Sequence, residues 1–101
     1  MRIIVLFNLK PGTDANAYER WARTTDMPSV RALRSIEGFE VYRTTGLLGS
    51  SARPAFAYIE VIDITDMQAF GADAATDAVQ KVVAQFQGFA QDPQFILTEK
   101  L

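Results

Sequence analysis

The side chains that could do chemistry in this sequence are carboxylates, hydroxyls and amines, because the chain contains no histidine and no cysteine. Their absence excludes thiol nucleophiles, thiolate zinc sites, imidazole bases, Ser-His-Asp triads and histidine-ligated haem. No acidic loop resembles a Ca²⁺ or Mg²⁺ site, and no glycine-rich run matches a nucleotide-binding loop. We therefore expect chemistry that needs no metal and no cofactor.

Asp26 is the sharpest candidate for proton transfer. It lies between two segments with helical spacing and close in sequence to the apolar residues Trp21 and Met27. A carboxylate held in apolar surroundings has a raised pKa and can take or give a proton near neutral pH. The alternative is that Asp26 caps the helical segment beginning at Met27 and Pro28, because Asp is a preferred N-cap and Pro is tolerated in a first turn. The two roles are compatible.

Asp73 is the second candidate for a catalytic carboxylate. It stands in the small-residue stretch Gly71–Ala75, which interrupts the second helical region. The alternative is that Asp73 is another N-cap or a solvated residue at the helix break. The hydroxyls of Tyr18 and Thr25 could bind a polar atom of a substrate.

The strands that must position these residues follow from the hydrophobic pattern. The first apolar run has aliphatic residues on both faces, which is typical of a central strand covered on both sides. A later run alternates along its length, as strands do. The predicted strands are Arg2–Lys10, Phe39–Leu48, Phe56–Asp63 and Phe95–Leu97, with a hairpin connection at Gly49–Pro54.

Two helical regions separate the strands. Thr13 or Asp14 caps the first region, which loosens around Asp26. Thr65 opens the second region through a capping box, and Gly88 stops it. The order β-α-β-β-α-β predicts one α+β, ferredoxin-like domain over the whole chain, with a four-stranded antiparallel sheet and both helices on one face.

A cavity between the sheet and the helices is the predicted binding site. By alternation, Ala57, Ile59 and Val61 of the third strand face the helices, while Tyr58 and Glu60 face the other way. The alternative is that the aromatic stripes are ordinary core. The predicted substrate-binding residues are Phe7, Tyr18, Trp21, Thr25, Ala57, Ile59, Phe70, Val83 and Phe86.

The opposite face of the sheet predicts a homodimer. It would carry Ile4, Leu6, Tyr42, Tyr58 and Ile62, which together are too apolar to stay in contact with water. Covering this face with a second copy gives a two-fold dimer.

Composition limits the other partners and the location. The net charge of −2 gives no electrostatic footprint for nucleic acid. No apolar run approaches the roughly 20 residues that cross a membrane, and the N-terminal run resembles no signal peptide. We therefore expect a cytoplasmic protein that binds neither nucleic acid nor membrane.

Four segments of the chain resemble the REDY-like HapK family. The segments are Met1–Gly12, Glu19–Arg31, Phe70–Thr76 and Phe95–Glu99, and the stretch Thr24–Pro28 is the most specific. The resemblance implies a dimeric α+β barrel with a cavity between sheet and helices. It also implies a role, without a cofactor, in ring-forming steps of prodiginine or bisindole-type alkaloid pathways.

A wider group of barrels includes the EthD-like proteins, in which a Trp precedes a His-x-Pro segment at about this point. Here Trp21 and Pro28 are kept, and the histidine position reads Asp26. The resulting hypothesis is a cofactor-independent cyclase that orients a hydrophobic aromatic intermediate and transfers protons through a carboxylate. The alternatives are a non-catalytic carrier or scaffold for a pathway enzyme, and a cofactor-independent monooxygenase.

Overall fold

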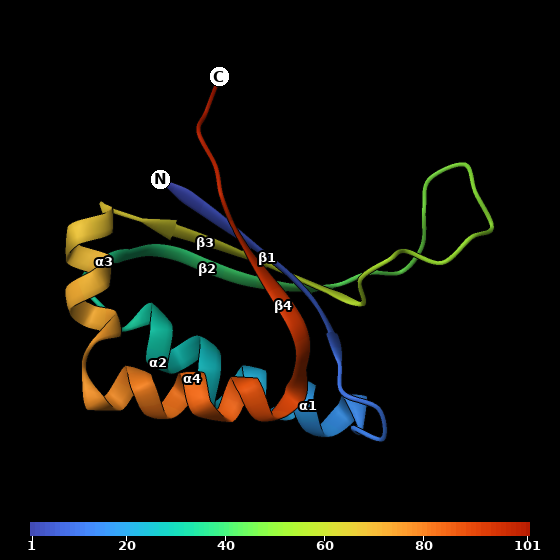
Figure 1. The fold of residues 1–101 in the computed structure, drawn as a ribbon, viewed down its shortest axis with the longest axis horizontal. Helices are drawn as coiled ribbons and strands as arrows, with labels where there is room; N and C mark the ends of the chain where they lie inside the picture. Colours follow the sequence, from blue (N-terminus) through green and yellow to red (C-terminus); the bar gives the residue numbers. More distant parts are fainter.

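The computed structural model describes residues 1–101 as a four-stranded antiparallel sheet with its helices on one face (Figure 1). The strand order is β2-β3-β1-β4, so the predicted ferredoxin-like arrangement is confirmed. The elements in chain order are β1 (Arg2–Leu9), α1 (Ala15–Trp21), the π-helix η1 (Ala22–Asp26), α2 (Met27–Arg31), β2 (Ile36–Arg43), β3 (Tyr58–Ile64), α3 (Met67–Ala74), α4 (Asp77–Phe89) and β4 (Ala90–Leu97).

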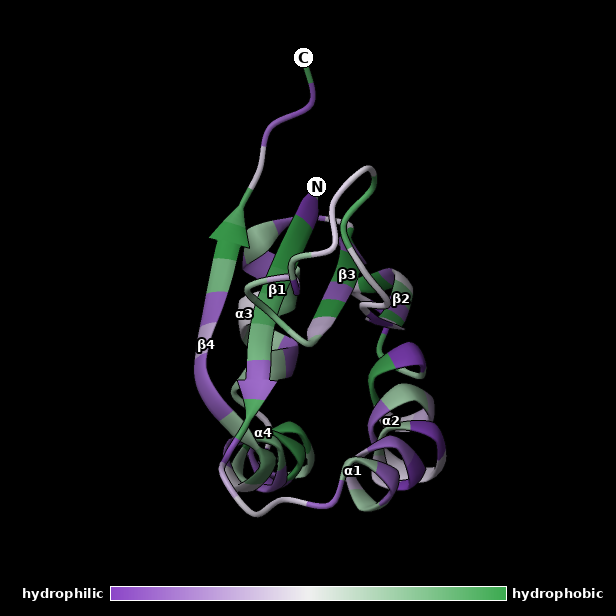
Figure 2. Ribbon diagram, turned by 90° about the vertical axis from the view of Figure 1, so that its right-hand side faces the viewer, coloured by the Kyte–Doolittle hydropathy of each residue, from purple (hydrophilic) through white to green (hydrophobic).

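Strand β1 is central, as its two apolar faces predicted. It pairs with β3 on one side and β4 on the other, and its ribbon is coloured hydrophobic over most of its length (Figure 2). Ile3, Val5 and Phe7 are buried beneath the helices, where Phe7 stacks on Tyr58 and meets the edge of Phe86. These residues form the centre of the core.

The predicted facing of β3 was wrong. Directly opposite residues of an antiparallel pair share a face, and β1 and β3 pair Phe7 with Tyr58 and Val5 with Glu60. Tyr58 and Glu60 therefore face the helices, and Ile59 faces away from them. Alternation could not decide between the two settings because both sets of residues are mostly apolar. Only the register against β1 fixes which set is inside.

Several helix ends differ from the prediction by about one residue. Asp14 caps α1 by accepting a hydrogen bond from the Asn16 amide, as one of the two predicted alternatives. The cap of α3 is Asp66, not Thr65, and its carboxylate accepts from the Ala69 amide. Helix α4 continues through Gly88, and β4 begins directly after it, so β4 is longer than predicted.

The face of the sheet opposite the helices is uncovered in the single chain (Figure 1). The predicted Tyr58 and Ile62 do not lie there, because the register turns both toward the helices, where they are buried. The apolar residues on the uncovered face are Ile4, Leu6, Tyr42, Ile59, Val61 and Ile96.

No helix of the chain is both long and apolar enough to span a membrane.

Candidate functional site

Two carboxyl groups are buried between the helices and the sheet. Asp26 ends the π-helix and Glu60 lies at the middle of β3, and each residue is 4% exposed. Burial raises the pKa of Asp26 to about 7. Burial, together with the negative charge of Asp26, raises the pKa of Glu60 to about 8. Both carboxyl groups therefore have a pKa near neutral pH and influence each other, and we call them the acid pair.

The hydroxyl of Tyr18 lies beside this acid pair. Tyr18 is fully buried, and no protein group hydrogen-bonds to its hydroxyl. Burial raises the pKa of Tyr18, and the negative charges of Glu60 and Asp26 raise it further. The Oε2 atom of Glu60 is also buried without a partner. Buried polar atoms without partners cost free energy, so a group of them is a place where a ligand atom can bind favourably.

The π-helix is what turns Asp26 inward. Pro28 has no amide hydrogen and its ring conflicts with the carbonyl four residues earlier, at Thr24, so a regular helix is disfavoured here. The chain widens instead, and the Met27 amide donates to the Ala22 carbonyl across a π turn. Asp26 makes no capping hydrogen bond to α2. The alternative role of Asp26 as a helix cap is therefore wrong, and the predicted loosening at this point is a π turn.

A pocket of about 180 Å³ is lined by Tyr18 and by neighbours of both acids, although Asp26 and Glu60 themselves do not line it. Its apolar walls include Ala22 and Met27, which flank Asp26 along the helix, and Val41, which pairs with Glu60 across the strands. The remaining lining residues are Tyr18, Glu19, Arg23, Arg43 and Tyr58. The pocket thus combines an apolar wall with a polar edge.

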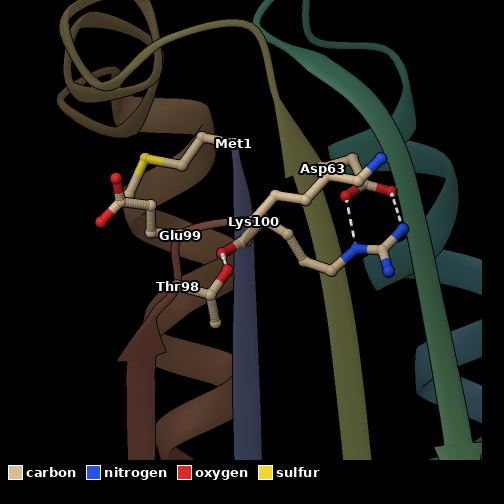
Figure 3. Close-up of a pocket in the computed structure, with 6 residues that line it drawn as sticks. Met1, Asp63, Thr98, Glu99 and Lys100 are labelled. Carbon is tan, nitrogen blue, oxygen red and sulfur yellow. Dashed lines mark hydrogen bonds and ion pairs between the residues drawn. The ribbon is translucent and has the colours of Figure 1, made fainter.

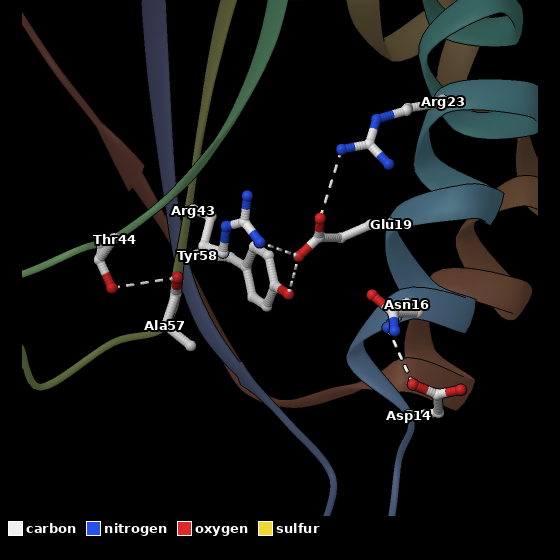
Figure 4. A network of polar contacts seen from close by, with 8 residues as sticks. All are labelled: Asp14, Asn16, Glu19, Arg23, Arg43, Thr44, Ala57 and Tyr58. Atoms are coloured by element: carbon white, nitrogen blue, oxygen red, sulfur yellow. Dashed lines mark hydrogen bonds and ion pairs between the residues drawn. The ribbon is translucent and has the colours of Figure 1, made fainter.

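Four polar residues meet at the edge of this pocket, and we call them the Glu19 cluster (Figure 4). The Tyr58 hydroxyl donates to Glu19 Oε2 at 2.8 Å. Arg43 of β2 lies 3.5 Å from the same oxygen, and Arg23 donates to Glu19 Oε1 at 3.3 Å. The hydrogen bond from Tyr58 joins the sheet to α1 beside the pocket.

Most of the predicted substrate-binding residues are core. Phe7 and Phe86 pack against each other in the centre, and Trp21 donates from its indole nitrogen to Gln85 at 2.9 Å. Phe70 is partly buried against the core, while Thr25 is half-buried and Val83 is 37% exposed. Of the predicted set, Tyr18 alone lines the pocket beside Asp26.

Three residues predicted to face the helices lie elsewhere. Ile59 and Val61 are on the uncovered sheet face, opposite Leu6 and Ile4. Ala57 precedes β3, where its amide donates to the side chain of Asn8 and its carbonyl accepts from Thr44. Ala57 therefore joins strand ends, and it does not line the pocket.

Asp73 is not part of the acid pair. Its carboxylate accepts a hydrogen bond from the Ser35 amide at 3.1 Å, which connects α3 to the start of β2. It does not cap α4 either, since Thr76 does so. The bond to Ser35 indicates a structural role, and the predicted catalytic role of Asp73 remains without support from its position.

Sequence reasoning missed Glu60 and the Glu19 cluster. Alternation alone puts Glu60 on the opposite face, and only its pairing with Val5 in the structure shows that it faces the helices. The Glu19 cluster joins residues from α1, η1, β2 and β3, so no local pattern in the sequence reveals it.

A separate cavity of about 560 Å³ lies where the two chain ends meet (Figure 3). It is lined by mostly charged residues, including the ion pair of Arg2 with Asp63, and by the C-terminal residues Thr98, Glu99 and Lys100. Asp63 is the last residue but one of β3 and is half-buried. This cavity is lined neither by Tyr18 nor by residues next to Asp26 or Glu60, so we assign no chemistry to it.

Comparisons with known proteins agree with the fold. A family model described as REDY-like protein HapK matches residues 1–101. No curated protein matches the sequence. The crystal structure of HapK from Hahella chejuensis is similar, with 31% sequence identity and a TM-score of 0.76 over 100% of this chain and 93% of that chain.

Two further solved structures share the fold at lower identity. An EthD family protein from Bacillus halodurans has 17% identity and a TM-score of 0.75, covering 100% of this chain and 99% of that chain. A protein from Thermobifida fusca described as dimeric and ferredoxin-like has 17% identity and a TM-score of 0.72, covering 94% of this chain and 85% of that chain.

Proposed function

Because the chain belongs to the REDY-like HapK family, we propose that it is a cofactor-independent enzyme of secondary metabolism. It binds a small aromatic intermediate of the prodiginine or bisindole type and closes a ring in it. The observation that carries this proposal is the pair of buried acids, Asp26 and Glu60, whose neighbours Met27 and Val41 line a partly apolar pocket together with Tyr18.

The two acids supply complementary halves of proton transfer. With a pKa of about 7, Asp26 is about half ionised at neutral pH and serves as the base. With a pKa of about 8, Glu60 still holds its proton at neutral pH and serves as the acid. During ring closure, Asp26 takes the proton that the substrate releases, and Glu60 donates a proton to the substrate. Transfer of one proton from Asp26 to Glu60 then restores the starting state of the pair.

Positioning accounts for the other part of the rate. Apolar walls at Ala22, Met27 and Val41 hold an aromatic ring in place. The unpartnered Tyr18 hydroxyl donates to a polar substrate atom. Holding two reacting parts of one molecule together is worth several kcal/mol, and each proton transfer contributes on the order of 10²–10⁴-fold.

We also propose that the protein works as a two-fold dimer. The uncovered sheet face is apolar, with Tyr42 at 54% and Ile96 at 38% exposure in the single chain. A second copy would cover it. The description of the Thermobifida fusca neighbour as dimeric supports this arrangement.

Product formation from uncyclised bisindole-type precursors, without added cofactor, tests the function. Asp26→Asn and Glu60→Gln keep the side-chain shapes, and we expect each to lower the rate about 10²-fold or more. Glu37→Gln, which changes an exposed acid, is the matched control and should keep the wild-type rate. The wild-type rate should rise as Asp26 ionises around pH 7 and fall above pH 8 as Glu60 loses its proton.

The proposal fails if both acid variants turn over the precursor at the wild-type rate. Tight binding of the precursor with no ring closure by any form would also refute catalysis and leave a carrier. Consumption of oxygen in step with product would indicate a monooxygenase in place of a cyclase.

A further inference from the structure

The Glu19 cluster gathers donors from three elements around one carboxylate. Arg23 comes from η1, Arg43 from the end of β2 and Tyr58 from the start of β3. All three contact the carboxylate of Glu19, whose side chain is 12% exposed (Figure 4). Donors that converge in this way form a binding site for a carboxylate, and here the protein's own side chain occupies it.

The contacts within the cluster leave capacity for another anion. The cluster has two guanidinium groups and one carboxylate, so it carries an excess positive charge. The contacts of Glu19 with Arg23 and Arg43, at 3.3 and 3.5 Å, exceed the 2.7–2.9 Å typical of charge-assisted hydrogen bonds. Both arginine side chains are more than 60% exposed, at 65% and 63%, so their remaining N–H groups are free to bind a ligand.

We propose that the pocket takes an aromatic carboxylate, an inference that rests on the proposed function. The carboxylate of the ligand replaces that of Glu19 among Arg23, Arg43 and Tyr58. Its ring lies against the apolar wall formed by Ala22, Met27 and Val41. Glu19 then turns toward solvent.

The size of the pocket limits the ligand further. Its volume of about 180 Å³ is below the roughly 300 Å³ at which pockets for drug-sized ligands begin. The part of the ligand held in the pocket is therefore one ring or two fused rings. A larger substrate would place its remaining rings outside, past the arginines.

Binding of 2-naphthoate, compared with the neutral 2-naphthamide, tests this inference by ligand fluorescence or calorimetry. Glu19→Gln removes the competing internal anion and keeps an acceptor for Tyr58, so we expect it to bind 2-naphthoate about threefold to tenfold more tightly than wild type. Arg43→Gln should weaken 2-naphthoate by a similar factor. Arg43→Lys should retain part of the preference, and Arg53→Gln in the exposed β2–β3 connection is the control that should change nothing.

Affinity for 2-naphthamide should vary less than about twofold among these variants, and added salt should weaken only the acid. Equal affinities for acid and amide in wild type, with no gain in Glu19→Gln, would overturn the inference and leave the acid-pair chemistry in place. Failure of all forms to bind either compound, with the proteins shown to be folded by thermal unfolding, would overturn both the inference and the assignment of the pocket. The turnover of Asp26→Asn tests the proposed function independently of these binding measurements.

Discussion

Neutralising the buried acids is expected to stabilise the protein at alkaline pH. Asp26 and Glu60 are almost fully buried, and neither belongs to any of the ion pairs of the chain. A buried carboxylate without a cation destabilises the folded state once it ionises. Asp26→Asn and Glu60→Gln replace the acids with neutral groups of nearly the same shape, so the folded variants avoid this cost.

The size of the effect follows from the linkage between proton binding and folding. The pKa of Asp26 is 3.8 ordinarily and about 7 in the folded protein. Between these values the folded state keeps a proton that the unfolded chain has released, so the free energy of unfolding falls as the pH rises. At about 1.4 kcal/mol for each pH unit, the complete loss above pH 7 approaches about 4 kcal/mol. Ionisation of Glu60 likewise lowers the free energy of unfolding as the pH rises from 4.5 to about 8.

Urea unfolding at pH 5 and pH 8.5, at one protein concentration, measures this effect. Wild type should lose several kcal/mol between the two pH values. Each variant should lose roughly 1–4 kcal/mol less, and Glu37→Gln should follow wild type. The reasoning is wrong if wild type has the same free energy of unfolding at both pH values and neither variant is more stable than wild type at pH 8.5. That result would mean that ionising these carboxyl groups costs the folded protein nothing.

Three other outcomes are expected. Ile59→Lys on the uncovered sheet face should convert a dimer to a monomer in sedimentation, because it would bury an unpaired ion; a wild-type monomer at micromolar concentration would contradict the dimer. Tyr18→Phe should change stability by less than about 1 kcal/mol, since the hydroxyl has no partner, while lowering turnover at least tenfold; unchanged turnover would show that the hydroxyl touches no reacting group. Turnover should survive a metal chelator, and its loss on chelation would show that a metal takes part.

The order of the elements was predictable because it depends on local patterns. Continuous apolar runs, turn residues and caps each act over a few positions, and they gave the ferredoxin-like arrangement that the structure has. Helix ends shifted by about a residue where two capping residues stand side by side, as Thr65 and Asp66 do, whereas β2 ends and β4 begins five residues before the predicted positions. Such shifts leave the topology unchanged.

The facing of β3 was not predictable in the same way, because it depends on pairing between distant strands. Ile59 and Val61 are as apolar as Tyr58 and Ile62, so placing Glu60 outside looked favourable on polarity alone. The pairing of Val5 with Glu60 places the acid inside. The sequence therefore revealed Asp26, which is marked by its neighbours Trp21 and Pro28, but not the second acid.

The π turn at Ala22–Asp26 also constrains how this chain can tolerate insertions and deletions. A regular α-helix turns about 100° per residue. Removing one residue between Ala22 and Asp26 would rotate Asp26 by about that angle relative to Tyr18, while Pro28 would still disfavour a regular helix. The carboxyl of Asp26 would then no longer lie beside Glu60. A length change here acts as the loss of a site residue, whereas the β2–β3 connection, which is largely exposed, can lengthen at little cost.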